Sequence, residues 1–509
     1  MTATRHRSQR VPDEGIRFLQ DMPARSKVGL WAHILGLGLA LLVSVVIGAT
    51  EYGTFAFVGM LSIIMTVAIL LKPQIGLYVL ILAVYSNISW VFTERFGTPG
   101  INKALIALLL VSVLATRLIL HRKPLIFRWT EASILAYIVL AIISTFAGEG
   151  VNANSFGNVL DLAKDFCIVV IVVQLSGEEN VWKTAQILLI ACAVGVSILS
   201  WYQGITGDYD TEFMGFAQSR MDSVQEDGDF YIDIRRSNGP IGDPNFYGQI
   251  LLMVYPIAAY RFFGERRLFQ KLLGLAATAI IAGAIVFTFS RGAMLVLVGI
   301  SGLILLERGF SIYKIAALGV VGLLILAPVL PAGYTERMLT VVGIGEPDTR
   351  PDVSMRGRTS EALVALEMFK DNPVLGIGYG MYEENYLDYS VDIGLDSRLE
   401  ERQAHSLYLE ALAETGLLGA ILLFTMLCII FRALYRARQR LIQIERHDLI
   451  PWVVGLAFGL LAYLVSSILL HDDFARYLRL SIALAVSATV LVDNLVEREK
   501  SVPTGRRVI

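Results

Sequence analysis

Long apolar runs, separated by short polar connections, recur along most of the sequence. A helix needs about 20 predominantly apolar residues to cross a bilayer, and most of these runs approach that length. The pattern therefore predicts about fourteen transmembrane helices, gathered in one bundle. They are expected near residues 29–48, 54–71, 74–92, 101–120, 132–148, 159–175, 182–204, 246–263, 270–289, 293–306, 312–330, 408–433, 450–470 and 476–493.

The composition agrees with a bundle that lies in a membrane. The chain has 509 residues, of which 55% are hydrophobic and 17% charged, with a mean hydropathy of +0.61. Soluble proteins carry roughly 25% charged residues. The expected fold class is thus an all-α polytopic membrane protein. A net charge of −2 argues against a nucleic-acid partner, and three cysteines without CxxC spacing predict neither disulfides nor a metal site.

The distribution of lysine and arginine predicts the orientation, because basic connections tend to stay in the cytoplasm. Residues 1–28 are polar and basic, and we interpret them as a retained cytoplasmic tail and not as a cleaved signal peptide. With that tail inside, the basic connections Arg117–Arg128, Arg261–Lys271 and Arg432–Arg446 and the C-terminal tail all fall on the cytoplasmic side. The two long connections then face the opposite side.

This orientation divides the chain into seven segments. The acids of the first long connection lack the ligand spacing of an EF-hand, so we interpret them as solvated surface. The predicted segments are a cytoplasmic tail (1–28), N-terminal transmembrane helices (29–204), an extracytoplasmic loop (205–245), further transmembrane helices (246–330), a large extracytoplasmic loop (331–407), C-terminal transmembrane helices (408–493) and a cytoplasmic tail (494–509).

Four polar stretches fall on the same, extracytoplasmic, surface in this topology. The first is IRRSNGPIGDPNFYGQI, residues 234–250. There, Asp243 is the expected N-cap and Pro244 the first residue of a helix. Asn245 follows them. Arg235 and Arg236 have two open interpretations, contact with lipid headgroups or a functional role.

The second stretch is FSRGAML, residues 289–295, between two apolar runs. An arginine near hydrocarbon is costly, on the order of 2.5–3.5 kcal/mol at the centre of a helix and less near the interface. Arg291 is therefore expected to have an anionic partner. The alternative is that its side chain extends to the lipid headgroups.

The third stretch is QAHSLYLEALAETGLLG, residues 403–419. Leu417–Tyr435 is long enough to cross the bilayer alone, so the preceding residues are expected at headgroup depth. His405 would begin this helix, where it can meet water and substrate. Glu410 and Glu414 lie one turn apart and would repel each other unless a cation is near, with Arg291 or Arg236 the natural candidate.

The fourth stretch is HDDFARYLRL, residues 471–480, which we interpret as a hydrophilic turn. It nevertheless supplies His471, a second histidine on the same surface. The large loop also contains an amphipathic helix candidate near 357–371, with Leu363, Leu366 and Phe369 apolar. We interpret that helix as a lid over the site.

At these residues the sequence resembles the O-antigen ligase and polymerase superfamily (Wzy/WaaL-like). The resemblance rests on RRSNGPIGDPNF, SRGAML, NPVLGIGYGMY at 372–382 and AHSLYLEALAETGLLG, in that order. It implies a GT-C-like helical bundle, an undecaprenyl-diphosphate-linked glycan donor, a glycan or lipid A-core acceptor, and no metal or other cofactor. It also implies the bacterial cytoplasmic (inner) membrane, and makes a chain-length regulator a candidate further partner.

Carried over residue by residue, the resemblance makes His405 the general base and Arg236 and Arg291 the arginines that hold the diphosphate. Substrate-binding candidates are Arg235, Asp243, Asn245, Glu410, Glu414 and His471. The expected reaction is concerted and inverting: His405 takes the proton of a sugar hydroxyl while that oxygen attacks the anomeric carbon. The guanidiniums would stabilise the charge on the leaving diphosphate.

Several alternatives stay open. A transporter or flippase would also place charges in a helical bundle, and broken helices near mid-membrane would favour it. A protein O-oligosaccharyltransferase would share the same core and differ in acceptor. Within the superfamily, the sequence does not separate polymerase from ligase, and it does not identify the donor sugar or the linkage.

Overall fold

The computed structural model describes residues 53–98, 100–148, 153–226, 230–326, 353–393, 402–471 and 475–501. The chain divides into two units, Met1–Leu71 and Lys72–Ile509. Within the first unit, the described residues form helix α3, Gly53–Leu71. The predicted tail 1–28 and the predicted helix 29–48 lie outside the described residues.

Helices account for most of the described second unit, as expected where backbone polar groups must be satisfied without water. Each predicted helix from residue 74 onward coincides with one or two helices of the structure. Their bounds are α4 Pro73–Tyr85, α5 Ile88–Phe96, α6 Ile101–Leu114 with a π-helical continuation η1 Ala115–Leu120, α7 Trp129–Ala147, α8 Ala153–Leu175, α9 Glu179–Thr206, α10 Pro244–Gly264, α11 Leu268–Phe287, α12 Arg291–Glu307, α13 Ile312–Leu326, α15 Val353–Asp371, α16 Tyr382–Asp392, α17 Leu407–Gln443, α18 Ile450–Ser466 and α19 Ala475–Ser501.

Within the described residues, six helices are long and apolar enough to cross a membrane, or up to seven if a bent pair counts as one span. The multi-pass membrane class is therefore supported, whereas the count of about fourteen spans stays a prediction. The six helices are Ile101–Leu120, Trp129–Ala147, Glu179–Thr206, Leu268–Phe287, Leu407–Gln443 and Arg476–Ser501.

The single helix predicted over 74–92 is wrong, because the chain bends by 61° between α4 and α5. Asn87 forms the break with a φ of 53°, a left-handed conformation that asparagine tolerates better than most residues. Its buried side-chain amide is held from two sides. Nδ2 donates to Pro240 O at 2.8 Å, and Oδ1 accepts from Arg476 Nη2 at 2.7 Å.

The predicted loop 205–245 contains a β-hairpin that the sequence analysis did not predict. Strand β1, Gln218–Glu226, pairs antiparallel with β2, Phe230–Gly239, so that Arg220 lies opposite Arg236. The base of the hairpin is fixed to α9. Ser237 Oγ donates to Ser200 Oγ at 2.8 Å, and Gln203 Nε2 donates to Ala217 O at 2.6 Å.

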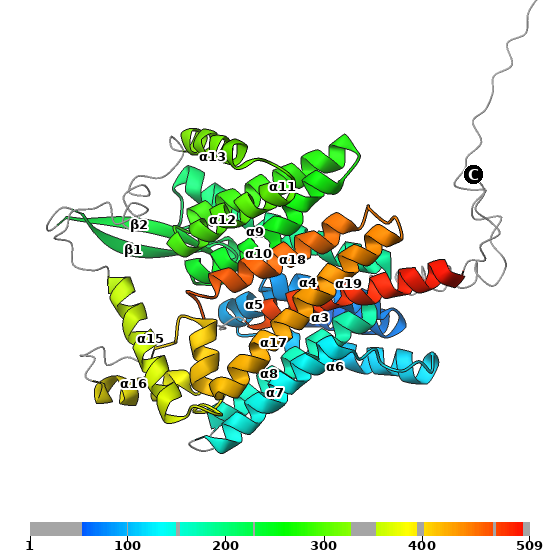
Figure 1. Ribbon diagram of the computed structural model, residues 1–509, viewed down its shortest axis with the longest axis horizontal. Coiled ribbons are helices and arrows are strands. Elements are labelled where there is room, and N and C mark those ends of the chain that lie inside the picture. The colour runs from blue at the N-terminus through cyan, green and yellow to red at the C-terminus, as the bar shows by residue number, and fades with distance from the viewer. Residues whose placement is uncertain are drawn as a thin grey trace, which may run out of the picture. The chain divides into compact units, whose positions relative to one another are not determined.

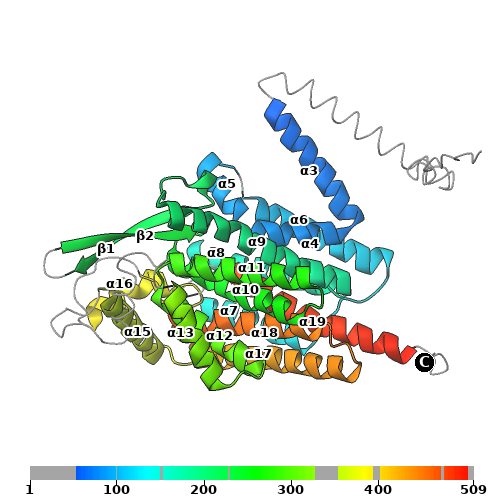
Figure 2. The same cartoon turned by 90° about the horizontal axis from the view of Figure 1, so that it is seen from above.

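The second unit has two distinct ends, which Figures 1 and 2 show from two directions. We call the end with β1–β2, α15 and α16 the hairpin end; α10, α12 and α17 begin there. At the other end, the arginine end, lie the three basic connections. Arg128 pairs with Asp493 at 2.7 Å, Arg446 pairs with Glu179 at 2.7 Å, and Arg261 stacks on the Trp452 ring at 3.3 Å. Which side of a membrane each end faces stays a prediction.

Helix α10 is the centre of the bundle and packs against α11 and α18. Its side chains are buried on all faces from Phe246 to Val254, as expected for a helix that is apolar all round. The predicted start signals are confirmed: Asp243 is the N-cap, and its Oδ1 accepts from Asn245 N at 2.7 Å and Phe246 N at 3.1 Å. This cap fixes the hairpin end of the central helix.

The predicted helix 357–371 exists as α15, but the predicted apolar face is wrong. Leu363 and Leu366 are exposed, while Val364, Ala365 and Met368 are buried in a small core with α16 and the start of α17. A buried acid, Glu361, lies on this inward face.

Candidate active site

Arg235 and Arg236 point in opposite directions, because successive side chains of a strand alternate between its two faces. Arg236 is buried, and its Nε donates to Thr288 O at 2.9 Å while Nη2 donates to Asn245 Oδ1 at 3.0 Å. Arg235 instead forms a 2.5 Å ion pair with exposed Asp210 in the acidic loop. The structure therefore gives Arg236 the inward position and Arg235 the solvent-facing one.

The segment that Arg236 contacts leads directly into α12. Thr288 lies three residues before Arg291, the first residue of α12, and Ser290 is the N-cap, whose Oγ accepts from Ala293 N at 3.4 Å. Helix N-termini carry a positive partial charge and unsatisfied amides that favour anions. Between this helix start and α10, α15 and α18 lies a small pocket. Its lining residues are Asn245, Gln249, Ser290, Gly292, Ala293, Arg358, Ser466, Leu469 and Leu470.

His405 faces a carboxylate that the sequence analysis missed. Its Nδ1 lies 3.2 Å from Glu361 Oε2 and 3.0 Å from the carbonyl oxygen of Gln403. In the neutral imidazole only one ring nitrogen carries a proton. Two acceptors around Nδ1 favour the proton there, which leaves Nε2 as the basic nitrogen. The residue has a φ of 43°, an uncommon conformation that its surroundings must enforce.

The pKa of His405 is raised above its ordinary value of 6.5. Burial lowers it, because desolvation disfavours the charged imidazolium, and the charge of Arg358 lowers it further. Contact with the Glu361 carboxylate, together with the hydrogen bond to the carbonyl oxygen of Gln403, outweighs both effects. The pair therefore makes a histidine that is a better base than free imidazole.

Glu361 is buried and is itself held in place by Arg402, whose Nη1 donates to Oε1 at 2.9 Å. The sequence carried a signal for it. Glu361 lies three, four and seven residues before Val364, Ala365 and Met368, on one face of α15. A carboxylate in the middle of an apolar helix face needs a partner. The face predicted to be apolar, with Leu363 and Leu366, is a different face of the helix.

His471 is buried, so its interpretation as part of an exposed hydrophilic turn is wrong; Asp472 and Asp473 lie outside the described residues. Its ring lies 5.3 Å from the His405 ring and 4.9 Å from the Phe246 ring, measured between centroids. Burial, together with the nearby charge of His405, lowers the pKa of His471 to about 3. It is therefore a neutral side chain at pH 7.

The two histidines are also linked through the backbone. Leu407 N, at the start of α17, donates to Leu470 O at 2.9 Å and Ser467 O at 3.1 Å. Gln249 Nε2 of α10 donates to Ser467 Oγ at 2.8 Å. These contacts connect the beginning of α17 to the end of α18 and to the central helix.

Helix α17 is broken at Gly416, where φ is 63° and ψ is −165°. The NPVLGIGYG segment fills the break. Leu417 N and Leu418 N donate to the carbonyl oxygens of Pro373 and Val374, at 2.9 and 3.3 Å. The helix carbonyls that lose these donors accept from the same segment instead, Ala413 O from the amide of residue 377 and Glu414 O from the amide of residue 378, both at 3.0 Å.

This exchange explains the glycines of the motif. A Cβ atom on Gly376 would lie 2.2 Å from the Glu414 carbonyl carbon, and one on Gly416 would lie 2.4 Å from the Val374 carbonyl carbon. Both glycines also have positive φ angles, which L side chains rarely adopt. Ser144 of α7 adds a third element, with Oγ 2.6 Å from both Leu375 O and Glu414 O.

The carboxylate of Glu414 lies at the start of α16. It is buried, and its Oε1 accepts from Tyr382 N, the first amide of that helix, at 3.1 Å. A helix N-terminus stabilises a negative charge, so Glu414 joins α17 to α16. Glu410 is half-buried in the first turn of α17. The pairing of these two acids with Arg291 or Arg236 stays a prediction.

The structure thus brings together two groups of the predicted residues. Arg236, Asn245 and the segment that begins α12 at Arg291 form one group, and His405 and His471 with Glu361 form the other. The Phe246 ring, one residue after Asn245, packs on His471 and joins them. Arg235 is not part of either group.

These observations define a multi-pass helical membrane protein with a His–Glu pair and the N-terminus of α12 at one end of its bundle. A family model described as O-Antigen ligase matches residues 276–424, which supports membership of the O-antigen ligase and polymerase superfamily. The matched region includes Arg291, Glu361 and His405, whereas Arg236 and His471 lie outside it. A search of curated proteins gave no match.

Proposed function

We propose that the protein is an inverting glycosyltransferase that moves a glycan from undecaprenyl diphosphate to a hydroxyl of an acceptor sugar. The family supports glycan transfer of the ligase or polymerase type by a membrane enzyme. The single observation that carries the proposal is the His405–Glu361 pair, with Nδ1 and Oε2 3.2 Å apart at the hairpin end.

In this mechanism His405 Nε2 takes the proton of the acceptor hydroxyl as its oxygen attacks the anomeric carbon. The bond from that carbon to the diphosphate oxygen breaks, and its electron pair leaves with undecaprenyl diphosphate. Glu361 fixes the tautomer and stabilises the imidazolium that forms. General-base assistance of this kind contributes typically 10²–10⁴-fold to a rate.

Arg236, Arg291 and the start of α12 are proposed to hold the diphosphate. Arg236 is positioned by Thr288 O and Asn245, so its guanidinium is preorganised and loses little freedom when an anion binds. Asn245 and the amides near Ser290 line the pocket beside it. Asp243 supports this arrangement by capping α10, and Arg235 is not proposed to touch the diphosphate.

The break in α17 supports a reaction at headgroup depth. Residues 417–435 follow the break and are long enough, at ~1.5 Å per residue, to cross most of a bilayer. His405 lies on the other side of the break, beyond the part that spans. The diphosphate of a lipid-linked donor also lies at headgroup depth, while its glycan would extend toward α15 and α16. We propose that this end faces the extracytoplasmic side of the bacterial inner membrane.

One feature of the structure bears on the transporter alternative. Broken helices near mid-membrane would favour a transporter, and α4 and α5 form a pair of helices that is bent by 61°. However, Asn87 at this break contacts Pro240 and Arg476, both at the hairpin end. The break therefore supports the candidate active site, which favours the transferase.

The test is glycan transfer by purified protein in liposomes that contain a lipid-linked donor. His405→Ala is expected to lower the turnover 10²–10⁴-fold. His447→Ala, the same substitution at an exposed position of the arginine end, is the matched control and is expected to keep normal turnover. Normal transfer by His405→Ala would overturn the proposal. Assays with and without lipid A core as acceptor separate ligase from polymerase.

A further inference from the structure

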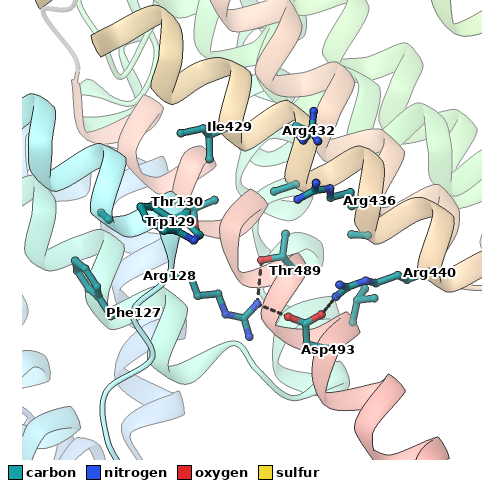
Figure 3. Close-up of a pocket in the computed structure, with 14 residues that line it drawn as sticks. Phe127, Arg128, Trp129, Thr130, Ile429, Arg432, Arg436, Arg440, Thr489 and Asp493 are labelled. Carbon is teal, nitrogen blue, oxygen red and sulfur yellow. Dashed lines mark hydrogen bonds and ion pairs between the residues drawn. The ribbon is translucent and has the colours of Figure 1, made fainter.

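A pocket lies at the arginine end, away from the candidate active site. It has a cavity volume of about 820 Å³. The start of α7, the last turns of α17 and the end of α19 form its walls, as Figure 3 shows. The proposed transfer reaction uses none of the residues that line it.

Four arginines line this pocket and only one acid. Asp493 already pairs with two of them, with Arg128 at 2.7 Å and with Arg440. Arg432 and Arg436 follow one another at a spacing of four residues on the same face of α17. Within the described part of the chain, neither makes a side-chain hydrogen bond or an ion pair. The pocket thus has an excess of positive charge and two guanidiniums available for an anion.

Apolar side chains beside these arginines indicate a lipid. Trp129 is 83% exposed and Phe127 is 55% exposed, and Ile429 lies next to them (Figure 3). Exposed tryptophan is typical of the membrane–water interface, where its ring meets both headgroups and acyl chains. A water-soluble anion would gain nothing from these exposed rings.

The depth of the pocket agrees with the interface. Arg436 follows Leu417, the residue after the break in α17, by 19 positions. At ~1.5 Å per residue this is ~29 Å, close to the ~30 Å thickness of the hydrocarbon core. If the break lies at one headgroup layer, Arg436 lies at the other.

We propose that this pocket binds the headgroup of an anionic glycerophospholipid from the leaflet at the arginine end. Arg432 and Arg436 would hold the phosphate, since guanidinium matches it in a bidentate way. The acyl chains would lie against Trp129 and Ile429. Basic pockets between transmembrane helices are a known way to bind such headgroups. The bound lipid would join α7, α17 and α19, and this proposal stands independently of the transfer reaction.

The experiment compares lipids retained by purified protein in native mass spectrometry. The probes are phosphatidylglycerol and phosphatidylcholine with identical acyl chains. A basic residue near an anionic surface contributes about 1 kcal/mol, which corresponds to about fivefold in affinity. Each of R432Q and R436Q is therefore expected to lower the preference for phosphatidylglycerol about fivefold, and R432Q/R436Q more strongly.

The matched control is R438Q, on the same helix, because Arg438 pairs with Glu307 at 3.7 Å and does not line the pocket. It is expected to keep the wild-type preference. An unchanged preference in both single variants and in the double variant would overturn the proposal. So would an equal loss in R438Q, because the effect would then be one of net charge and not of this pocket.

A second measurement separates a lipid from a water-soluble phosphate. Thermal unfolding is followed in phosphatidylcholine nanodiscs, with added phosphatidylglycerol or with added inorganic phosphate. Phosphatidylglycerol is expected to raise the unfolding temperature of the wild type and of R438Q, but not of R432Q/R436Q. If inorganic phosphate raised it as much, and lost this effect in R432Q/R436Q, the lipid proposal would be wrong.

Discussion

Glu361 and His405 lie 44 positions apart in the sequence, and the buried carboxylate of the first reaches Nδ1 of the second at 3.2 Å. The carboxylate comes from α15 and the imidazole from the residue before the N-cap of α17. Arg402 holds the other oxygen of Glu361 at 2.9 Å. The proposed base is thus oriented by a residue that lies inside the O-antigen ligase match, as His405 does.

Replacing Glu361 with Gln is expected to lower the turnover and to shift its pH dependence. Transfer requires neutral His405, so the rate of the wild type should fall as the pH drops through the raised pKa of His405. Without the negative charge, burial and Arg358 dominate and this pKa falls. The fall in rate on the acidic side of the pH profile should therefore move to lower pH. The measurement is turnover against pH for both proteins, and a fall in rate at unchanged pH would exclude this role for Glu361.

Arg236→Lys and Arg235→Lys form a matched pair on β2. Lysine cannot reproduce the two hydrogen bonds from the Arg236 guanidinium to Thr288 O and Asn245 Oδ1. Loss of one preorganised donor typically costs about 10²–10³-fold in turnover. Arg235 makes an exposed ion pair, and solvent-exposed ion pairs contribute little, so its variant is expected to stay near wild type. Transfer rates with the lipid-linked donor check both, and equal losses would contradict the assignment.

Gly376→Ala is expected to destabilise the protein, because the new methyl group would meet the Glu414 backbone at 2.2 Å where φ is +73°. Strain of this kind costs on the order of 1–3 kcal/mol. Gly299→Ala in α12 is the control, since a Cβ there meets nothing within 4 Å, and alanine favours a helix by up to ~1 kcal/mol. Thermal unfolding in detergent compares the two, and an unchanged midpoint for Gly376→Ala would show that the break adapts.

The two histidines are expected to affect stability in opposite directions as the pH falls. The folded pKa of His471 is about 3, below its unfolded value near 6.5. Between these values the unfolded chain binds the extra proton, so His471 lowers stability as the pH falls, by about 1.4 kcal/mol per pH unit. The pKa of His405 is raised, so its pairing with Glu361 stabilises at low pH and is lost as the pH rises through the folded pKa.

His471→Phe keeps an aromatic ring beside Phe246 and removes the titration. This variant is expected to lose less stability than the wild type between pH 6.5 and pH 4. The measurement is the unfolding midpoint of both proteins across this range. Parallel curves would show that His471 is already charged in the folded protein.

Much of the fold could be predicted because the bilayer leaves a simple signature in the sequence. Apolar runs mark helices, and Asp243 and Pro244 mark the start of α10, which the structure confirms. The hairpin was missed because β1 lacks the alternation that identifies a half-buried strand, and β2 alternates only over residues 230–235, after an acidic segment. The break at Asn87 was missed because a hydropathy profile averages over a window of residues and does not depend on the left-handed backbone conformation of one residue.

The candidate site was predictable only in part, for a related reason. His405, Arg236 and Arg291 stand out as polar residues beside apolar runs. Glu361 stands out only once the buried face of α15 is known, and that face is set by the packing of α15 against α16 and α17. His471 looked exposed among acids, and its burial depends on Phe246, which is distant in the chain.

The break in α17 has a consequence for how the chain is made. The carbonyl and amide groups that replace the missing helical bonds belong to residues 373–378, and Ser144 belongs to α7. All of them precede α17 in the chain and are therefore synthesised before residues 407–443. The groups that satisfy the backbone of the interrupted helix therefore all come from earlier segments of the chain, and none of these contacts requires a segment that is synthesised later.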